Sequence, residues 1–144
     1  MKSATGYVGI KNLGCICYMN SFMQQLFMIP YFRHAITATE DPCFSPAPED
    51  IEDNLLFQIQ KMFLNLQHSE KKFYNPKDFC HAIKDYEGNP TNVAEQMDID
   101  EFSGILFDRL ENQLKQTKQE TLIKDMFGGV FSNEIVCKGC PHFS

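Results

Sequence analysis

The stretch GIKNLGCICYMNSFMQQLF, residues 9–27, joins a glycine-bearing loop to the start of an amphipathic helix. After Cys17 its apolar side chains recur every three to four residues, and Pro30 marks the point where a helix would end. Two cysteines, Cys15 and Cys17, lie one residue apart at the junction. We therefore predict a helix that begins near Cys17, with both thiols at its start.

A cysteine in the first turn of a helix meets unpaired backbone N–H groups and the positive end of the helix dipole, which both stabilise a thiolate. Gly14 lets the preceding loop approach closely and exposes N–H groups that suit an oxyanion, and Asn12 adds a side-chain donor. Acyl transfer to Cys17 needs this arrangement. A structural role is the alternative, because free cysteine is among the most buried residue types.

Cys15 is expected simply to fill space beside the junction. A metal site at the two cysteines is disfavoured, because Cys-x-Cys without nearby histidine or acidic partners offers too few ligands.

Composition limits the class of protein. The chain has 144 residues, 43% hydrophobic and 22% charged, which fits one globular domain rather than a disordered or fibrous protein. The net charge of −6 argues against a sequence-independent nucleic-acid binder and for a neutral or basic partner. No window reaches the ~18 apolar residues of a membrane span, and the start lacks a secretory signal. We expect a cytoplasmic protein, with the nucleus as a second location; its oligomeric state is left open.

In a reducing compartment the six cysteines are more often buried, catalytic or metal-binding than paired as disulfides. They are Cys15, Cys17, Cys43, Cys80, Cys137 and Cys140.

The middle of the chain predicts two further helices. Residues 39–53, rich in proline and acids, are expected to form an exposed loop, and an amphipathic helix follows over residues 51–66. A helix capped by Asn75 and opened by Pro76 comes next. It carries Cys80 and His81, for which we expect a buried and a surface position.

The longest predicted helix follows Asp98 and includes Phe102 and Leu114 at helical spacing. After it the pattern changes, because residues 126–144 contain paired glycines, alternating apolar positions and a Cys-x-x-Cys turn. A strand followed by a knuckle is predicted. Cys137 and Cys140 supply two of the four ligands of a structural zinc site, with a redox pair as the alternative. His142 lies too close to Cys140 to be a comfortable ligand.

Residues 9–26 resemble the cysteine box of the ubiquitin-specific proteases. Their sequence is similar to that of the large fat-facets-type members of the family. The resemblance places the family's nucleophile on Cys17 and its oxyanion-supporting asparagine on Asn12. Cys15 and Ile16 depart from the family pattern. Other positions that match it are Gly14, Tyr18, Asn20, Ser21, Gln25 and Leu26.

Two more blocks support the resemblance. EQMDIDEF, residues 95–102, is similar to the family's Gln-x-Asp-x-x-Glu-Phe box, which implies that Gln96, Asp98 and Glu101 lie near the channel for the basic C-terminal tail of ubiquitin. A plain capping box for the following helix is the alternative for Asp98 and Glu101. Residues 127–142 resemble the start of the fingers region, where the knuckle is half of a zinc site.

The resemblance implies an α+β fold of the papain-like cysteine protease type. Residues 1–126 would form a helical thumb, and residues 127–144 the start of a zinc-ribbon β fingers region. The implied function is a deubiquitinase that cleaves isopeptide bonds at the C-terminus of ubiquitin. Its partners would be ubiquitin and ubiquitinated proteins, with no nucleic acid and no membrane, and its cofactor a structural Zn²⁺ held by half a site.

A cysteine protease also needs a base and a residue that orients it. None of His34, His68, His81 and His142 lies in a context like the family's histidine box, so the palm region is expected to be absent and the chain to be an inert fragment. Two alternatives stay open. One is a non-catalytic ubiquitin-binding fragment or pseudoenzyme, and the other is a zinc-binding or redox adaptor.

Overall fold

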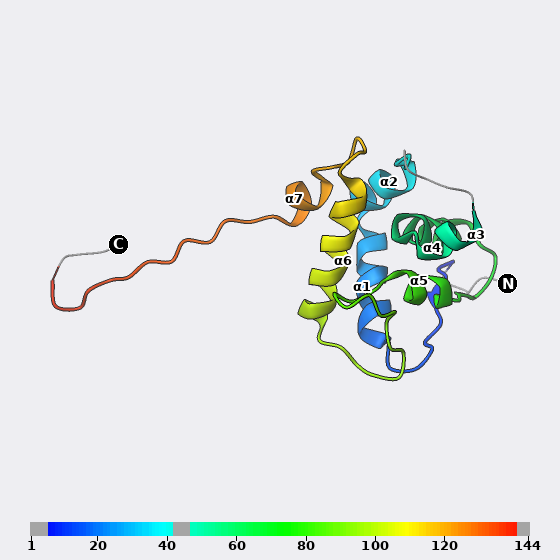
Figure 1. The fold of residues 1–144 in the computed structure, drawn as a ribbon, viewed down its shortest axis with the longest axis horizontal. Helices are drawn as coiled ribbons and strands as arrows, with labels where there is room; N and C mark the ends of the chain where they lie inside the picture. Colours follow the sequence, from blue (N-terminus) through cyan, green and yellow to red (C-terminus); the bar gives the residue numbers. More distant parts are fainter. Residues whose placement is uncertain (1–5, 42–46, 141–144) are drawn as a thin grey trace.

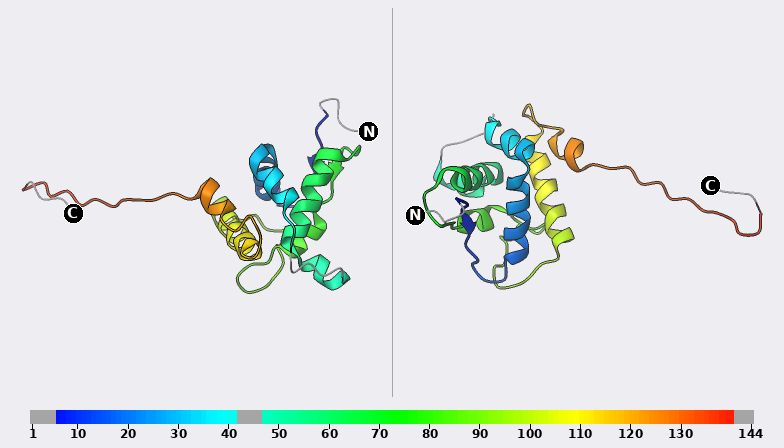
Figure 2. Two further views of the ribbon diagram at one scale, coloured as in Figure 1. Left: turned by 90° about the horizontal axis from the view of Figure 1, so that it is seen from above. Right: turned by 180° about the vertical axis from the view of Figure 1, so that it is seen from behind.

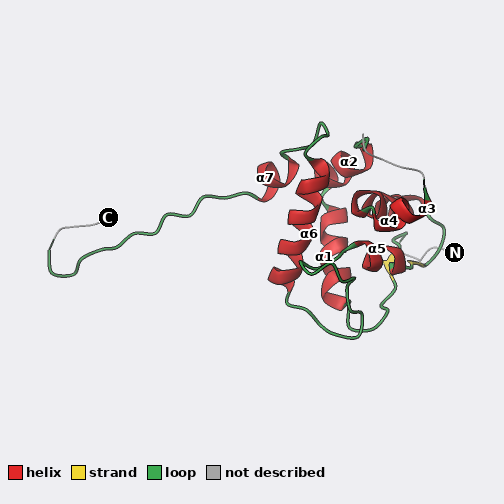
Figure 3. Cartoon of the chain, viewed as in Figure 1, coloured by secondary structure: helices red, strands yellow, loops and turns green. Residues whose placement is uncertain are grey.

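The computed structural model describes residues 6–41 and 47–140, which form a helix-rich body with one small parallel sheet (Figure 1; Figure 3). The helices are α1 (Cys17–Met28), α2 (Pro30–Ala38), α3 (Pro48–Asp53), α4 (Leu55–His68), α5 (Lys77–Ala82), α6 (Ile99–Leu114) and α7 (Leu122–Phe127). The strands are β1 (Gly9–Ile10) and β2 (Phe73–Tyr74). Helices with a small sheet agree with the predicted α+β class. No helix in the described ranges combines the length and the apolar character that crossing a membrane requires.

The predicted helix at Cys17 is confirmed. It starts at that residue and ends at Met28, and Pro30 opens the next helix instead of continuing the first. Proline has no N–H to donate within a helix but suits a first helical position. Helices α1 and α6 lie side by side with their first residues at the same end of the body (Figure 1).

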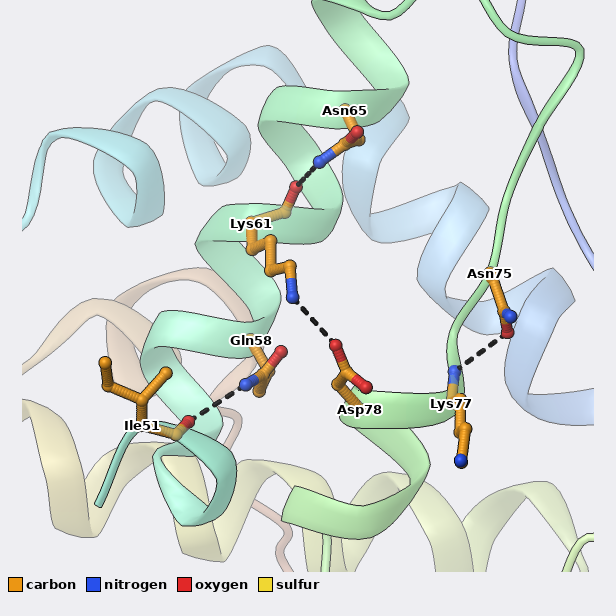
Figure 4. Close-up of polar contacts among 7 residues, drawn as sticks. All are labelled: Ile51, Gln58, Lys61, Asn65, Asn75, Lys77 and Asp78. Carbon is orange, nitrogen blue, oxygen red and sulfur yellow. Dashed lines mark hydrogen bonds and ion pairs between the residues drawn. The ribbon is translucent and has the colours of Figure 1, made fainter. Parts of the chain in front are cut away.

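The predicted single helix over residues 51–66 is wrong, because it is split at Asn54. The backbone of Asn54 is extended, with φ −81° and ψ 100°, and its side-chain oxygen accepts a hydrogen bond from Phe57 N at 2.9 Å. An asparagine in this role caps a new helix. Gln58, only 1% exposed, joins the two helices by donating to Ile51 O at 2.9 Å (Figure 4).

The predicted loop over residues 39–53 is also partly wrong. Its last six residues are helix α3, in which Pro48 takes the first position. Residues 42–46, which include Cys43, lie outside the described ranges.

Helix α5 begins one residue later than predicted, at Lys77, because Pro76 is the capping residue rather than the first helical one. The side-chain oxygen of Asn75 accepts from Lys77 N at 3.2 Å, and an ion pair of 2.7 Å between Lys61 and Asp78 ties α5 to α4 (Figure 4). Cys80 is 4% exposed, so its predicted burial is confirmed, and burial raises the pKa of its thiol to about 11. The predicted surface position of His81 is confirmed too.

Aromatic rings fill the interior between the helices. Phe63 on α4 is fully buried, with its ring centroid 5.6 Å from Phe27 and 6.2 Å from Phe32. A second group forms where α6 meets α1, with Phe102 in edge-to-face contact with Tyr18 at 5.5 Å. Such edge-to-face pairs add to the free energy gained by burial. They fix α1 from both sides.

Residues 128–140 leave α7 as an extended chain that runs away from the helical body (Figure 1; Figure 2). The predicted strand is wrong, since these residues form no strand of two or more residues. Val130 and Phe131 are 99% and 96% exposed. A strand must pair its N–H and C=O groups with a neighbour, and no strand among the described residues lies beside this segment. His142 lies outside the described residues.

Candidate active site

Cys17 is exposed at the first residue of α1. The residue before it, Ile16, is fully buried and caps the helix with its backbone only, since no side chain caps this end. The first N–H groups of a helix have no intrahelical acceptor. A thiol and unpaired amide donors therefore meet at this surface.

The loop before Cys17 is anchored by β1, which pairs in parallel with β2 in the register Gly9 to Phe73 and Ile10 to Tyr74. Lys11 N continues the ladder by donating to Tyr74 O at 2.9 Å. The sequence reasoning missed this sheet, because two-residue strands carry no readable period.

Two amide side chains of α1 hold the same loop from the other side. Asn20 Nδ2 donates to Lys11 O at 3.3 Å, and Gln24 Nε2 donates to Val8 O at 3.1 Å. The resemblance places the family's glutamine on Gln25, but the glutamine that holds this loop is its neighbour Gln24. Gln25 is exposed, whereas Gln24 holds the loop before Cys17 through its bond to Val8 O.

A close backbone crossing requires the glycine at position 14. Cys15 N donates to Val93 O at 2.7 Å, and a Cβ added to Gly14 would lie 2.3 Å from that same oxygen. Real Cβ atoms do not come so close, so any other residue would push the two backbones apart. Val93 precedes the Gln-x-Asp box, and this contact joins that box to the cysteine box.

Asn12 is exposed, and its side-chain oxygen accepts from Gly14 N at 3.2 Å in a local turn. With its oxygen engaged, Asn12 has its Nδ2 group left to donate. The amides of Gly14 and Cys15 are both already bonded, so the predicted use of loop N–H groups around Gly14 for an oxyanion is wrong for these two. Asn12 Nδ2 and the N–H of Cys17, at the first residue of α1, remain as donors at this surface.

The prediction that Cys15 fills space is wrong. Cys15 is exposed, and the buried side chain at this junction is Ile16, which is 0% exposed. The backbone turns the two cysteines outward and the isoleucine inward.

Gln96, Asp98 and Glu101 are all exposed at the start of α6. Asp98 caps this helix, accepting from Asp100 N at 2.8 Å. Within the described residues the Glu101 side chain accepts no return bond from the backbone N–H of Asp98, so the capping box considered as the alternative is only half formed.

Tyr18 links the start of α6 to the start of α1. Burial raises the pKa of its hydroxyl, and the nearby Cys80, Cys17 and Glu101 raise it further. The structure thus brings Cys17 and Glu101 to one end of the molecule, beside the Tyr18–Phe102 ring contact.

His34, His68 and His81 are exposed, and within residues 6–41 and 47–140 no hydrogen bond or ion pair joins Cys17 to a histidine. His34 lies on α2, beyond the far end of α1 (Figure 1). At a rise of 1.5 Å per residue, the two ends of α1 are about 16 Å apart. His81 lies near Asp53, with Nδ1 3.4 Å from a carboxylate oxygen.

Cys137 and Cys140 are exposed on one turn of the extended segment. A hydrogen bond with the Cys140 side chain, helped by the backbone N–H groups of Gly139 and Cys140, holds the pKa of the Cys137 thiol below its ordinary value. Two sulfurs this close suit one metal ion, but the described residues contain no group of three or more potential metal ligands.

The family model for ubiquitin carboxyl-terminal hydrolases matches residues 8–143. The chain belongs to this family. It is 38% identical over 145 residues to human ubiquitin carboxyl-terminal hydrolase 34, covering 100% of this chain. It is 33% identical over 141 residues to mouse ubiquitin carboxyl-terminal hydrolase 24 and 34% identical over 141 residues to human ubiquitin carboxyl-terminal hydrolase 47, each alignment covering 98% of this chain. The alignments span 4%, 5% and 10% of these three relatives, respectively.

Proposed function

We propose that this chain carries the nucleophile of a deubiquitinase, a papain-like thiol hydrolase that cleaves the isopeptide bond after the C-terminal glycine of ubiquitin. The observation that supports it best is the exposed Cys17 at the first residue of α1, behind a loop held by Val93 O. Family membership supports the same reaction class, as does the name of each relative, ubiquitin carboxyl-terminal hydrolase.

In the proposed reaction Cys17 Sγ attacks the carbonyl carbon of the isopeptide bond. Asn12 Nδ2 and the N–H of Cys17 donate to the oxyanion that develops, and donors fixed in advance are worth most in such a step. The turn that engages the Asn12 oxygen holds this side chain in place before substrate arrives.

The start of α6 is proposed to meet the tail of ubiquitin. Gln96, Asp98 and Glu101 are exposed at the same end as Cys17, and carboxylates there suit a basic peptide. Asp98 serves two purposes in this proposal, since it also caps the helix.

The base that takes the thiol proton is proposed to be a histidine that this sequence does not include, because none of His34, His68 and His81 is bonded to Cys17 and His142 lacks the sequence context of the family's histidine box. Without that base the thiol adds to an electrophile, but the leaving amine is not protonated. We therefore expect the 144-residue chain alone to form adducts with ubiquitin electrophiles and not to turn over. The same observation favours a second candidate, a non-catalytic ubiquitin-binding protein.

We also propose residues 1–126 as a thumb and residues 127–144 as the start of zinc-binding fingers. Cys137 and Cys140 would hold Zn²⁺ with two further ligands, and the metal would have a structural role. Added Zn²⁺ should slow alkylation of Cys137 and Cys140 and leave Cys17 unaffected. Equal slowing at Cys17 would contradict this assignment.

The decisive test is labelling of the purified chain with ubiquitin that bears a C-terminal electrophile. We expect one adduct, mapped to Cys17 and absent from Cys17→Ala. Cys15→Ala is the matched control, because it removes the neighbouring exposed thiol and should keep the adduct. An alkylating reagent of small size, used in parallel, reports whether the thiol is accessible without ubiquitin recognition.

An adduct at Cys15 or at several cysteines would contradict the assignment of the nucleophile. Binding of ubiquitin without any adduct, while the small reagent modifies Cys17, would favour the non-catalytic candidate.

A further inference from the structure

Two exposed thiols flank one buried side chain at the start of α1. Cys15 and Cys17 both face solvent, whereas Ile16 between them is 0% exposed. Ile16 anchors this junction in the core, and both thiols lie on the solvent-facing side of the same short stretch.

The backbone at Ile16 also brings the two residues close. Its φ of −100° and ψ of 21° make a turn rather than an extended link. Two successive Cα–Cα steps of ~3.8 Å that meet at such a turn leave their ends about 5.5 Å apart. Disulfides most often join Cα atoms that are ~5.5–6 Å apart.

The other described cysteines are poor partners for Cys17. Cys80 is buried, and Cys137 and Cys140 lie on the extended segment beyond α7. Cys15 is the exposed thiol that adjoins Cys17 in the described chain.

We propose that Cys15 and Cys17 form a reversible disulfide when the protein meets a hydroperoxide, with Cys15 as the resolving thiol. The site itself depends only on the geometry of the two cysteines. Its consequence, reversible shut-off of the nucleophile, rests on the proposed function of Cys17.

The chemistry balances in two steps. The Cys17 thiolate attacks one oxygen of hydrogen peroxide, the O–O bond breaks, and a sulfenic acid and hydroxide result. The Cys15 thiolate then attacks the Cys17 sulfur, so that the S–S bond forms, the S–O bond breaks and hydroxide leaves as water after taking a proton. Each sulfur has lost one electron, and the peroxide has taken up both.

Such a disulfide would protect as well as inhibit. A sulfenic acid with no thiol beside it proceeds to sulfinic and sulfonic acids, which are not readily reversed. A small ring closed over one residue is strained, and strained or exposed disulfides are the readily reduced ones.

The test is peroxide treatment of the folded chain, alkylation of the remaining thiols and mass analysis of tryptic peptides. Cleavage after Lys11 and Arg33 gives a peptide, residues 12–33, that contains Cys15 and Cys17 and no other cysteine. We expect this peptide to appear without alkyl groups and lighter by two hydrogens, and to regain both thiols after dithiothreitol. Cys80 should stay unmodified until the chain is unfolded, which shows that the fold was intact.

Cys15→Ser is the matched variant. Because Cys15 is exposed, the substitution should leave the fold intact. After the same peroxide dose we expect it to lose Cys17 irreversibly about tenfold faster than the native chain. Equal irreversible loss in both proteins would overturn the proposal. The proposal would also be overturned by native chains in which dimedone traps Cys17 as a sulfenic acid while Cys15 remains a free thiol that the alkylating reagent modifies.

The two proposals fail separately. Disulfide formation in a chain that never reacts with the ubiquitin electrophile would leave this site standing and remove its proposed effect on catalysis. Reaction with the ubiquitin electrophile but no disulfide under peroxide would remove this site and leave the proposed function of Cys17 standing.

Discussion

The helical body, residues 6–127, and the segment that follows it, residues 128–140, treat the same kinds of side chain in opposite ways. Phe63 in the body is 0% exposed and touches two other rings, whereas Phe131 in the segment is 96% exposed. Cys80 is buried, whereas Cys137 is exposed. Residue type does not decide burial here. Burial depends on whether a side chain has a surface to pack on, and the segment has no such surface among the described residues.

The largest contrast should come from removing the two phenylalanines one at a time. Phe63→Ala is expected to lower the free energy of unfolding by about 3–5 kcal/mol, because it opens a cavity between α4, α1 and α2. Phe131→Ala is expected to change it by less than about 0.5 kcal/mol. Urea unfolding followed by circular dichroism measures both. A large effect of Phe131→Ala would show that the segment packs on the body in solution.

Glycine gives a second, smaller contrast. Gly14→Ala places a Cβ against Val93 O and should displace the loop before Cys17, whereas a Cβ at Gly129 meets nothing within 4 Å. A shift of about 1 Å at a reacting group can cost ~100-fold in rate, so we expect that order of loss in labelling of Gly14→Ala by the ubiquitin electrophile. Gly129→Ala should label like the native chain. Undiminished labelling of Gly14→Ala would mean that the crossing with Val93 does not position Cys17.

The smallest contrast concerns pH. The pKa of Cys80 rises from 9.0 to about 11 on burial, so the folded state holds this proton more tightly than the unfolded one. Stability that is present below pH 9 is therefore lost as pH rises toward 11, by roughly 2–3 kcal/mol. The pKa of Tyr74, raised to about 12, adds a loss at higher pH.

Cys80→Ala should remove the part of this slope that begins near pH 9, as measured by urea unfolding at a series of pH values. Cys137 is exposed on the segment beyond α7, so Cys137→Ala should leave the loss of stability above pH 9 unchanged. The same slope in Cys80→Ala as in the native chain would show that another group causes it.

The sequence predicted the parts of the fold that depend on local rules. Proline at position 30 separates two helices, and Asp98 caps α6, because each effect acts within a few residues. The start of α1 at Cys17 was predicted for the same reason. The break at Asn54 was missed, since the apolar period runs through it and only the local cap reveals it.

The residues of the candidate site come from the family resemblance, which names Cys17, Asn12 and Asp98, and their roles stay predictions. The resemblance does not provide the geometry that holds them. The crossing of Val93 over Gly14 and the pairing of β1 with β2 join positions far apart in the chain, which no local pattern encodes. The exposure of Cys15 was missed because the prediction relied on the general tendency of cysteine to be buried. The sequence does not show in which direction a single turn points its side chain.

The hydrogen bond from Cys15 to Val93 also sets an order of events during synthesis. Cys17 is made before Val93, and its loop cannot close until Val93 has been added, several seconds later at ordinary translation rates. Closure over so long a stretch of chain is a slow, late step in folding. A nascent chain thus carries its two neighbouring thiols in an open loop until the region around Val93 has emerged from the ribosome.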